Sequence, residues 1–402
     1  IDMANSDFDP LSLYLHIPFC SSKCGYCDFN SYEGLDHLVP EYTPALLSEI
    51  ELWSAAAKSY ALRTIFFGGG TPSLTDLEDI KEILRSVHAN YQLMETVECS
   101  LEANPTELTL EHLTGLRELG INRLSMGVQS MNEEELLLLE RDHSPARVLD
   151  AVADARAAGF DNINLDLMFG LPDQTLETWQ QSVRTIVSLG TEHLSCYALT
   201  VEPGTALYYQ VQKGFTPEPD PDMAAEQYEW TQDYLKENGY VQYEISNWSK
   251  PGKECQHNIV YWNAAPYLGI GAGAHSFFAG QRFGNTDAPN RYIEQVIETK
   301  LERDNKGRAT MRQIAGGETP DRETLISDAI ILGLRLLQGV NEDEFETRHG
   351  VRPSAYFAKQ FSKHADNGLI ELEENSVKLS ARGLLLSNEV FIDLIPDREV
   401  VS

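Results

Sequence analysis

The 402-residue chain is 42% hydrophobic, which is enough to bury a large core and to form two or three domains. Its 62 acidic and 31 basic residues give a formal net charge of -31 at pH 7, so the surface should repel nucleic acid and anionic lipid headgroups. No apolar run is long enough to span a bilayer, and the opening segment IDMANSDFDP lacks the basic residues and apolar stretch of a signal peptide. From Ile1 onward, we therefore expect a soluble, cytoplasmic protein without a nucleic-acid partner.

Short runs of β-branched or aromatic residues alternate with longer helical patterns from residue 11 onward, as is typical of parallel βα units. Six strands are predicted, at residues 13–17, 63–67, 97–102, 123–126, 162–168 and 193–199. Apolar residues at helical spacing predict helices between several of them, at 41–58, 74–88 and 176–189. The expected α/β fold is a partial (β/α)6 barrel of the TIM type.

The second half of the chain has a different pattern. The segment KGFTPEPDPD predicts an exposed connection at 215–222, followed by a helix at 223–238. Past Gly316, consecutive helices precede short strands at 370–373 and 377–380 and a helix from Ala381, which predicts a smaller C-terminal helical, winged-helix-like domain. We therefore expect three parts, namely the barrel, an extension and the C-terminal domain, at 1–215, 216–315 and 316–402.

Three of the six cysteines, Cys20, Cys24 and Cys27, form a C-x3-C-x2-C pattern directly after the first predicted strand. In a barrel, the loops at the carboxyl ends of the strands form the functional face. Three thiolates can bind three irons of a 4Fe-4S cubane and leave the fourth iron open to a small molecule. Structural zinc is the alternative, but it usually needs a fourth Cys or His. The pattern favours a cluster in a reducing compartment, and we expect Cys99 and Cys196 to be core residues.

Further residues that could bind a ligand follow the next predicted strands. Glycines in GGGTP, residues 68–72, would let the backbone approach a ligand, although a tight turn is the alternative. Glu102, Gln129 and Asp166 lie in or just after later strands, where they would bind hydroxyl and ammonium groups or serve as helix caps. The glycines of YLGIGAGAHSF lack the G-x-G-x-x-G spacing, so a close-packed turn is expected there instead of a dinucleotide site.

The segment LYLHIPFCSSKCGYCDF, together with GGGTP, resembles the radical S-adenosylmethionine superfamily, specifically its coproporphyrinogen dehydrogenase-like branch. The resemblance runs through most of the chain. It implies a 4Fe-4S cluster on the three cysteines, with S-adenosylmethionine bound to the open iron as a source of the 5'-deoxyadenosyl radical. It also implies an S-adenosylmethionine pocket lined by Tyr14, Tyr26, Gly69, Gly70, Thr71, Glu102, Gln129, Arg141, Asp166 and Ala198. Arg141 lies in a region predicted to be helical, where a solvated surface charge is the alternative.

Two features distinguish the relatives within this branch. The enzymes carry a further cysteine two residues after the third, where this chain has Phe29. The segment ECQHNIVYWN resembles the HNxxYW motif that is associated with heme chaperones of the branch. His257 would offer an axial ligand to heme iron, and Tyr261 and Trp262 would offer flat faces to the porphyrin. A core histidine is the alternative for His257, and Cys255 is a rival ligand or a buried hydrophobe.

The resemblance therefore implies a heme chaperone that binds heme and passes it to apoproteins such as respiratory cytochromes. The alternative is an oxygen-independent coproporphyrinogen III dehydrogenase, which catalyses a radical oxidative decarboxylation, and Phe29 counts against it. A plain iron-sulfur electron carrier would not explain GGGTP, Glu102 and Asp166. The sequence leaves open whether S-adenosylmethionine is cleaved, whether the protein is a homodimer, and whether it meets membranes peripherally through its recipients.

Overall fold

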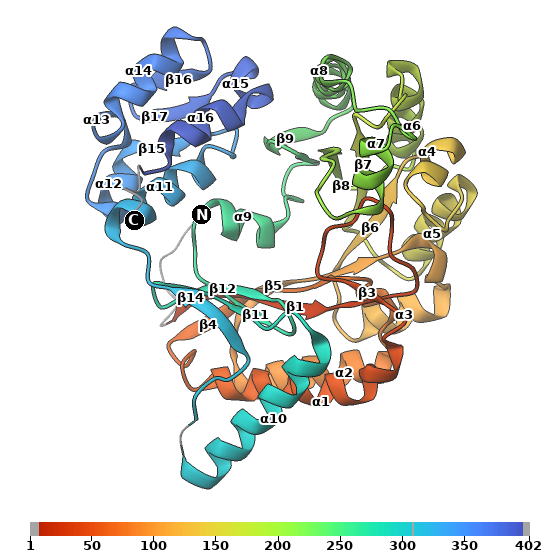
Figure 1. Ribbon diagram of the computed structural model, residues 1–402, viewed down its shortest axis with the longest axis vertical. Coiled ribbons are helices and arrows are strands. Elements are labelled where there is room, and N and C mark those ends of the chain that lie inside the picture. The colour runs from red at the N-terminus through yellow and green to blue at the C-terminus, as the bar shows by residue number, and fades with distance from the viewer. Residues whose placement is uncertain (1–7, 308, 397–402) are drawn as a thin grey trace. The chain divides into compact units, whose positions relative to one another are not determined.

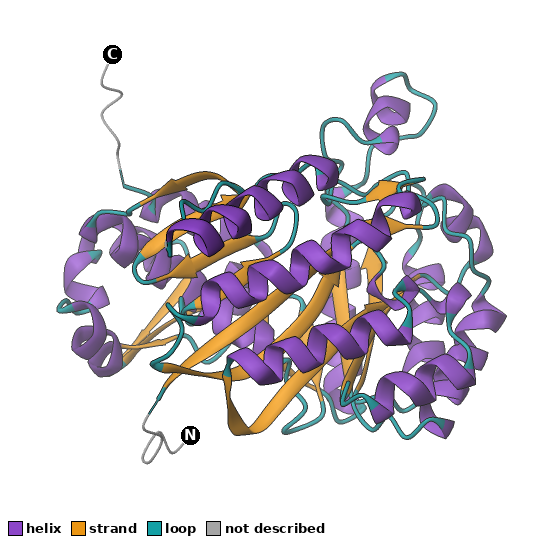
Figure 2. Cartoon of the chain, turned by 90° about the horizontal axis from the view of Figure 1, so that it is seen from below, coloured by secondary structure: helices purple, strands orange, loops and turns teal. Residues whose placement is uncertain are grey.

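The computed structural model describes residues 8–307 and 309–396 (Figures 1 and 2). These residues divide into two compact units. The first contains the described parts of Ile1–Gly239 and Pro266–Glu318, and the second those of Tyr240–Ala265 and Thr319–Ser402. Within the described ranges, no helix is both long and apolar enough to cross a lipid bilayer.

A sheet of parallel strands forms the centre of the first unit. The six predicted strands are all present and pair in chain order. They are β1 (Asp9–Ile17), β4 (Tyr60–Gly69), β5 (Gln92–Ala103), β6 (Arg123–Gln129), β7 (Ile163–Phe169) and β8 (His193–Ala198). Most residues in their interiors are buried, as in Ile163–Phe169, where Asp166 alone is partly exposed, because parallel strands are covered on both faces. This arrangement confirms the predicted partial barrel.

Helices follow these strands and cover the sheet, and Figure 2 shows such helices lying across the strands. Before residue 240, where the chain enters the second unit, the helices of the first unit are α1 (Val39–Ser54), α2 (Leu77–Asn90), α3 (Leu110–Glu118), α4 (Glu133–Leu138), α5 (Pro145–Ala157), α6 (Leu176–Ser188), α7 (Ala206–Gln212) and α8 (Pro221–Glu237). Helix α6 shows why they form. The Thr175 side chain caps it by accepting the N–H of Thr178 at 3.2 Å, and Trp179, Val183 and Ile186 form its buried stripe.

The prediction that the connection extends to residue 222 is wrong by two residues. Pro221 begins α8, and Asp220 caps it by accepting the N–H of Asp222 at 2.9 Å. Proline is favoured at the first position of a helix because its missing N–H has no partner there anyway. The Pro and Asp residues that suggested a loop are therefore also the start signal of the helix.

The segment after residue 265 extends the sheet beyond β1. Strand β11 (Tyr267–Ile270) pairs with β1 in parallel, with Leu13 opposite Leu268. The antiparallel strands that continue the sheet, and the helix beside them, are β12 (His275–Phe278), β13 (Gln281–Asn285), β14 (Ile314–Glu318) and α10 (Pro289–Lys306). The turn after β11 is close-packed as predicted, since a Cβ on Gly271 would lie 2.6 Å from the His16 carbonyl oxygen.

The second unit combines a hairpin and a helix with the C-terminal elements. The first group is β9 (Val241–Glu244), β10 (Asn247–Ser249) and α9 (Gln256–Trp262). The C-terminal group is α11 (Arg322–Gly333), β15 (Val340–Asn341), α12 (Glu342–His349), α13 (Pro353–Tyr356), α14 (Ala358–Asp366), β16 (Ile370–Glu373), β17 (Ser376–Leu379), α15 (Ala381–Leu385) and α16 (Ser387–Leu394). Strands β15, β17 and β16 form an antiparallel sheet, which agrees with the predicted winged-helix-like pattern.

The predicted boundaries at 215 and 315 do not coincide with the two units. The expected extension 216–315 is divided, because residues 240–265 belong to the second unit and the rest to the first. Pairing of β11 with β1 explains this division, since hydrogen bonds join residues more than 250 positions apart in the sequence. Local sequence patterns carry no signal for such a contact.

A buried carboxylate fastens α1 to the segment after residue 265. Glu49 accepts hydrogen bonds from the Tyr292 hydroxyl at 2.6 Å, the Gly271 N–H at 2.9 Å and the Asn285 amide at 2.9 Å. The Gln313 amide donates a further bond at 3.2 Å. Burial raises the pKa of Glu49, while these hydrogen bonds oppose the shift. The carboxylate therefore accepts hydrogen bonds from four residues that are distant from it in the sequence.

Replacing Glu49 by alanine should lower the free energy of unfolding by about 2–4 kcal/mol, because its donors would lose their acceptor inside the core. Denaturant unfolding followed by circular dichroism measures this loss. Glu51→Ala is the matched control on the same helix, since its side chain is 45% exposed and pairs only with surface cations. It should change the free energy by no more than about 1 kcal/mol. Equal losses in both variants would contradict the role of Glu49.

Candidate functional site

The three cysteines lie just beyond the carboxyl end of β1, with Cys24 and Cys27 in the loop that joins β2 (Phe19–Cys20) to β3 (Tyr32–Glu33). Cys20 ends β2, and the N–H of Cys27 donates to the Cys24 carbonyl at 3.1 Å. The Lys23 ammonium donates to the carbonyls of Phe29 and Ser31, at 3.1 and 2.9 Å, and so holds the loop in shape. All three thiols are free of disulfides.

Each sulfur has a hydrogen-bonding neighbour. The Thr71 hydroxyl donates to Cys20 Sγ at 3.6 Å, the Ser31 hydroxyl lies 3.7 Å from Cys27 Sγ, and Arg141 Nη1 donates to Cys24 Sγ at 3.2 Å. Burial raises the pKa of the Cys20 thiol, and the hydroxyl groups of Thr71 and Ser31 oppose that shift. Donors of this kind stabilise thiolate, which is the form that binds metal.

Three thiolates are the number that a 4Fe-4S cubane with one open iron needs. In a cubane, each thiolate binds a different iron, so the three sulfurs do not need to converge on one point. The loop therefore fits a 4Fe-4S cluster with one open iron.

The glycine run lies against the cysteine loop. The N–H groups of Gly70 and Thr71 donate to the carbonyls of Ile17 and Phe19, both at 2.8 Å. Gly69 has a φ of 118°, and a Cβ there would come within 2.5 Å of the His16 ring. Only glycine fits this position. The run is thus part of the site and not a simple turn.

Two acidic side chains form the next part of the site. The Glu102 carboxylate accepts the Gly69 N–H at 3.0 Å, and Asp166 accepts the Asn164 amide at 2.8 Å and the Ser125 hydroxyl at 3.4 Å. Burial, and then the charge of Asp166, raise the pKa of Glu102 from its ordinary value of 4.5 to about 7. Burial also raises the pKa of Asp166. A ligand with ammonium or hydroxyl donors would therefore stabilise both carboxylates.

The prediction that Arg141 lies in a helix is wrong. Arg141 lies in the loop between α4 and α5, and its guanidinium points inward instead of into solvent. Besides Cys24, it donates to the Gly127 carbonyl at 2.7 Å and to Asn104 Oδ1 at 3.2 Å. Gln129, at the end of β6, has a φ of 67°, a left-handed conformation that is uncommon for glutamine. Strained residues of this kind are found at ligand sites.

A cavity of about 140 Å³ brings these groups together. Its lining includes the three cysteines and most of the predicted pocket, namely Tyr26, Gly69, Gly70, Thr71, Glu102, Gln129, Arg141 and Asp166. Tyr14 and Ala198 are not in the lining. The Tyr14 hydroxyl instead donates to His16 Nδ1 at 3.0 Å, and Ala198 is an exposed residue at the end of β8.

Sequence reasoning missed several residues of this cavity. They are Ser22, Lys23, Phe29, Ser31, Ala103, Asn104, Ser125 and Gly127. Phe29, which replaces the further cysteine of the related enzymes, also lines the cavity. Asn104 carries a usable signal, because it directly follows β5 and lies two positions after Glu102.

The HNxxYW segment lies in the second unit, on α9. The His257 side chain is 1% exposed, and its Nε2 lies 2.9 Å from the Tyr261 hydroxyl, with the two rings edge to face. Burial lowers the pKa of His257 to about 3, so the imidazole is neutral. Cys255, directly before α9, is buried as well.

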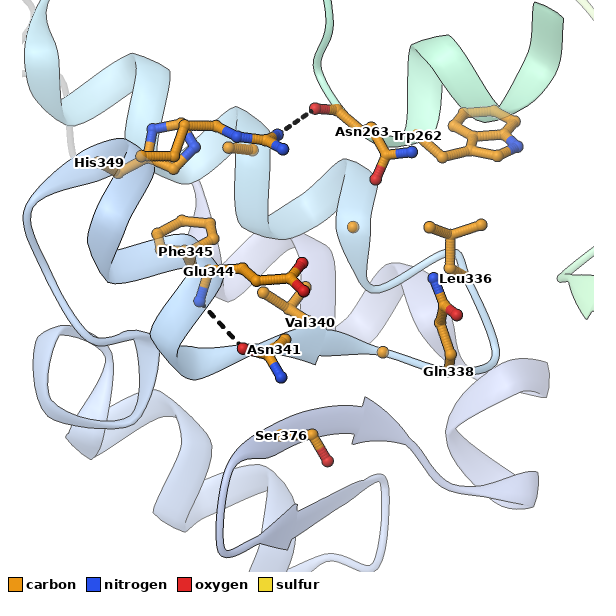
Figure 3. A pocket seen from close by; sticks show the side chains of 14 residues that line it. Trp262, Asn263, Leu336, Gln338, Val340, Asn341, Glu344, Phe345, His349 and Ser376 are labelled. Carbon is orange, nitrogen blue, oxygen red and sulfur yellow. Dashed lines mark hydrogen bonds between the residues drawn. The ribbon is translucent and has the colours of Figure 1, made fainter. Parts of the chain in front are cut away.

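Trp262 has a different environment at the end of the same helix. It is half-buried and lines a cavity of about 300 Å³, shown in Figure 3, together with Asn263 and residues of the C-terminal elements. The Arg335 guanidinium lies 4.2 Å from the centre of the Trp262 ring. The motif is therefore divided between the interior of the unit and a cavity wall.

Comparisons with known proteins identify the family. The Radical SAM superfamily matches residues 14–186, and the HemN C-terminal domain matches residues 321–386. The heme chaperone HemW of Bacillus subtilis (strain 168) is 39% identical, over 94% of this chain and 98% of its own length. The chain belongs to the HemW family. HemW of Mycobacterium tuberculosis (strain ATCC 25618 / H37Rv) is 36% identical, over 96% of this chain and 95% of its own.

The fold of this HemW-family chain also matches a solved structure. Coproporphyrinogen III oxidase (HemN) from Escherichia coli, described as a radical SAM enzyme, aligns with a TM-score of 0.81 and 26% identity. The alignment covers 97% of this chain and 91% of HemN. These matches confirm the predicted superfamily, branch and barrel. The HemN C-terminal match also lies within the predicted C-terminal domain.

The raised pKa of Glu102 makes the stability of the cofactor-free protein depend on pH. The folded-state pKa of about 7 lies above the ordinary value of 4.5, so the protonated Glu102 favours the folded state. This stabilisation is fully present below pH 4.5 and is lost as the pH rises through 7. Glutamine at position 102 stays neutral at every pH. As the pH rises from 4.5 to 7, the free energy of unfolding of Glu102→Gln should therefore increase by about 1–3 kcal/mol relative to that of the wild type.

Denaturant unfolding of both proteins across this pH range measures that difference. Glu95→Gln is the control, because Glu95 is an exposed carboxylate on the same strand, and it should follow the wild type. Parallel pH profiles for the wild type and Glu102→Gln would show that Glu102 has no raised pKa.

Proposed function

We propose that this protein is a heme chaperone of radical SAM fold, which binds heme and transfers it to apoproteins such as respiratory cytochromes. One observation carries the proposal: nearly the whole chain aligns with nearly the whole of a protein named heme chaperone HemW, at 39% identity. The recipient protein, a homodimer and peripheral membrane contact through recipients remain predictions of the sequence.

We also propose that Cys20, Cys24 and Cys27 hold a 4Fe-4S cluster and that S-adenosylmethionine occupies the adjacent cavity. When bound, such a cluster offers an open iron to the amino and carboxylate groups of the cofactor and can supply it with an electron. The chain supplies backbone groups at Gly69 to Thr71 that allow close approach. Glu102 and Asp166 accept hydrogen bonds from ammonium and hydroxyl groups, and the Arg141 guanidinium balances negative charge.

A coproporphyrinogen III dehydrogenase is the second candidate, because the alignment with HemN extends over both units. Phe29 argues against it. This side chain stands at the position of the enzymes' additional cysteine, lines the cavity and is 67% exposed. A phenyl ring can neither bind metal nor transfer a proton. Chemistry that needs a thiol at this position is therefore absent from this chain.

Cys24→Ala should abolish the cluster after anaerobic reconstitution, because two thiolates cannot secure a cubane normally held by three. Iron and sulfide analysis measures the loss against about four of each in the wild type. Cys99→Ala is the matched control, since it removes a buried thiol from the interior of β5, and it should keep the full content. Full iron and sulfide in Cys24→Ala would refute the ligand assignment.

The reconstituted wild type should bind heme and should not decarboxylate coproporphyrinogen III. Heme titration by absorbance and a decarboxylation assay with S-adenosylmethionine and a reductant, run on the same preparation, test both points. A Phe29→Cys variant shows whether the missing thiol alone accounts for the absent activity. Robust decarboxylation by the wild type would overturn the chaperone proposal in favour of the dehydrogenase.

A further inference from the structure

The Arg141 guanidinium makes a charged contact with one of the three sulfurs. Its Nη1 donates to Cys24 Sγ at 3.2 Å, whereas the hydroxyl neighbours of Cys20 and Cys27 lie at 3.6 and 3.7 Å. A hydrogen bond that involves an ionised group is roughly twice as strong as one between neutral groups. The negative charge of a Cys24 thiolate is therefore balanced directly, while the other two sulfurs have uncharged neighbours.

Two further acceptors hold the guanidinium in this position. Its Nη2 donates to the Gly127 carbonyl at 2.7 Å and to Asn104 Oδ1 at 3.2 Å. The side-chain amide of Asn104 donates in turn to Asp142 Oδ1 at 3.2 Å, which keeps the Asn104 oxygen turned toward Arg141. The planar guanidinium has five donors in a fixed arrangement, so one side chain can bond a sulfur, a carbonyl and an amide at once.

The backbone at the end of α4 directs Arg141 inward. The Glu140 N–H donates to the Leu137 carbonyl at 3.1 Å, and the next N–H, of Arg141, donates to the Leu136 carbonyl at 2.9 Å. This pair of bonds ends a helix with a left-handed residue, and Glu140 has a φ of 55°. The turn lies against the cysteine loop, since a Cβ on Gly25 would lie 2.9 Å from Glu140 Cδ.

A cation at this place affects how easily a cluster accepts an electron. One-electron reduction adds one negative charge, and the reduction potential depends on net charge, on hydrogen bonds to the sulfurs and on exposure to solvent. The surroundings oppose the added charge, because the chain has a net charge of -31 and the cavity is lined by Glu102 and Asp166. Lys23, also in the lining, already donates to two backbone carbonyls of the loop.

We propose that Arg141 raises the reduction potential of the cluster through its bond to Cys24, and that Asn104 is the positioning residue that holds the guanidinium there. The inference rests on the proposed 4Fe-4S cluster and names a control on its reduction. At a higher potential, a weaker external electron donor can reduce the cluster. This role is separate from any contact between Arg141 and S-adenosylmethionine, because the bond to the sulfur needs no ligand in the cavity.

Reductive titration of the anaerobically reconstituted full-length protein with dithionite, without S-adenosylmethionine, tests this role. Electron paramagnetic resonance follows the reduced cluster and gives its midpoint potential. At the wild-type midpoint, Arg141→Met should lower the ratio of reduced to oxidised cluster about tenfold, which is a shift of about 59 mV to more negative potential for one electron. Asn104→Ala should lower the same ratio about threefold, because the guanidinium loses an acceptor that fixes it. Arg141→Lys keeps the charge without the planar fork and should lie between Arg141→Met and the wild type.

Arg117→Met is the matched control. Arg117 lies near the end of α3, just before β6 and so away from the carboxyl ends of the strands, and its Nε donates to the Gly159 carbonyl at 3.2 Å. This variant should keep the wild-type potential. A wild-type potential in Arg141→Met with full iron and sulfide content, or an equal shift in Arg117→Met, would overturn the inference. If Arg141→Met holds no cluster, wild-type potentials in both Arg141→Lys and Asn104→Ala would overturn it instead.

Iron and sulfide analysis and heme titration of the wild type separate this inference from the proposed function. A wild type that takes up no iron and sulfide would overturn both the cluster assignment and the role of Arg141. A wild type that carries the cluster but binds no heme would refute the chaperone function, while the shift in potential would still support the inference.

Discussion

Parallel pairing of β1 with β4 is the interaction on which the cysteine site depends. It places Ile17 opposite Gly69, so the loop after one strand meets the loop after the next. Bonds from the Gly70 and Thr71 N–H groups to the carbonyls of Ile17 and Phe19 continue this pairing beyond the strands. The cysteine loop and the glycine run are therefore one rigid structure. Because the remaining strands pair in chain order, Glu102, Gln129 and Asp166 come to the same edge.

The polar groups of this edge are held in a poorly solvated space. Burial raises the pKa of both Glu102 and Asp166, and the Arg141 guanidinium lies close to the Cys24 sulfur. Such an arrangement is costly unless a ligand supplies the missing partners. The same arrangement makes a site specific, because a ligand without the matching donors leaves buried charges unpaired. Amino, carboxylate and hydroxyl groups on one molecule would satisfy all of them.

The two units divide the chemistry of this HemW-family chain. The first unit contains the three cysteines and the charged cavity, while the second contains the aromatic residues of the HNxxYW segment. That segment has a structural and a surface part. His257 and Tyr261 bond to each other inside the unit, and Trp262 reaches the cavity wall. The six residues from His257 to Trp262 thus contribute both to the interior of the unit and to a cavity wall.

The sequence by itself determined the six parallel strands and most of the residues of the candidate cofactor pocket. Strand and helix patterns repeat locally, and the cysteine pattern and GGGTP are each a short continuous segment of the chain, so no long-range contact was needed to recognise either one. Only the tertiary structure decided the inward position of Arg141, the attachment of β11 to β1 and the burial of His257. The physical reason is that burial and orientation depend on packing between distant segments. A histidine or an arginine has the same sequence signature whether it faces solvent, a cavity or the core.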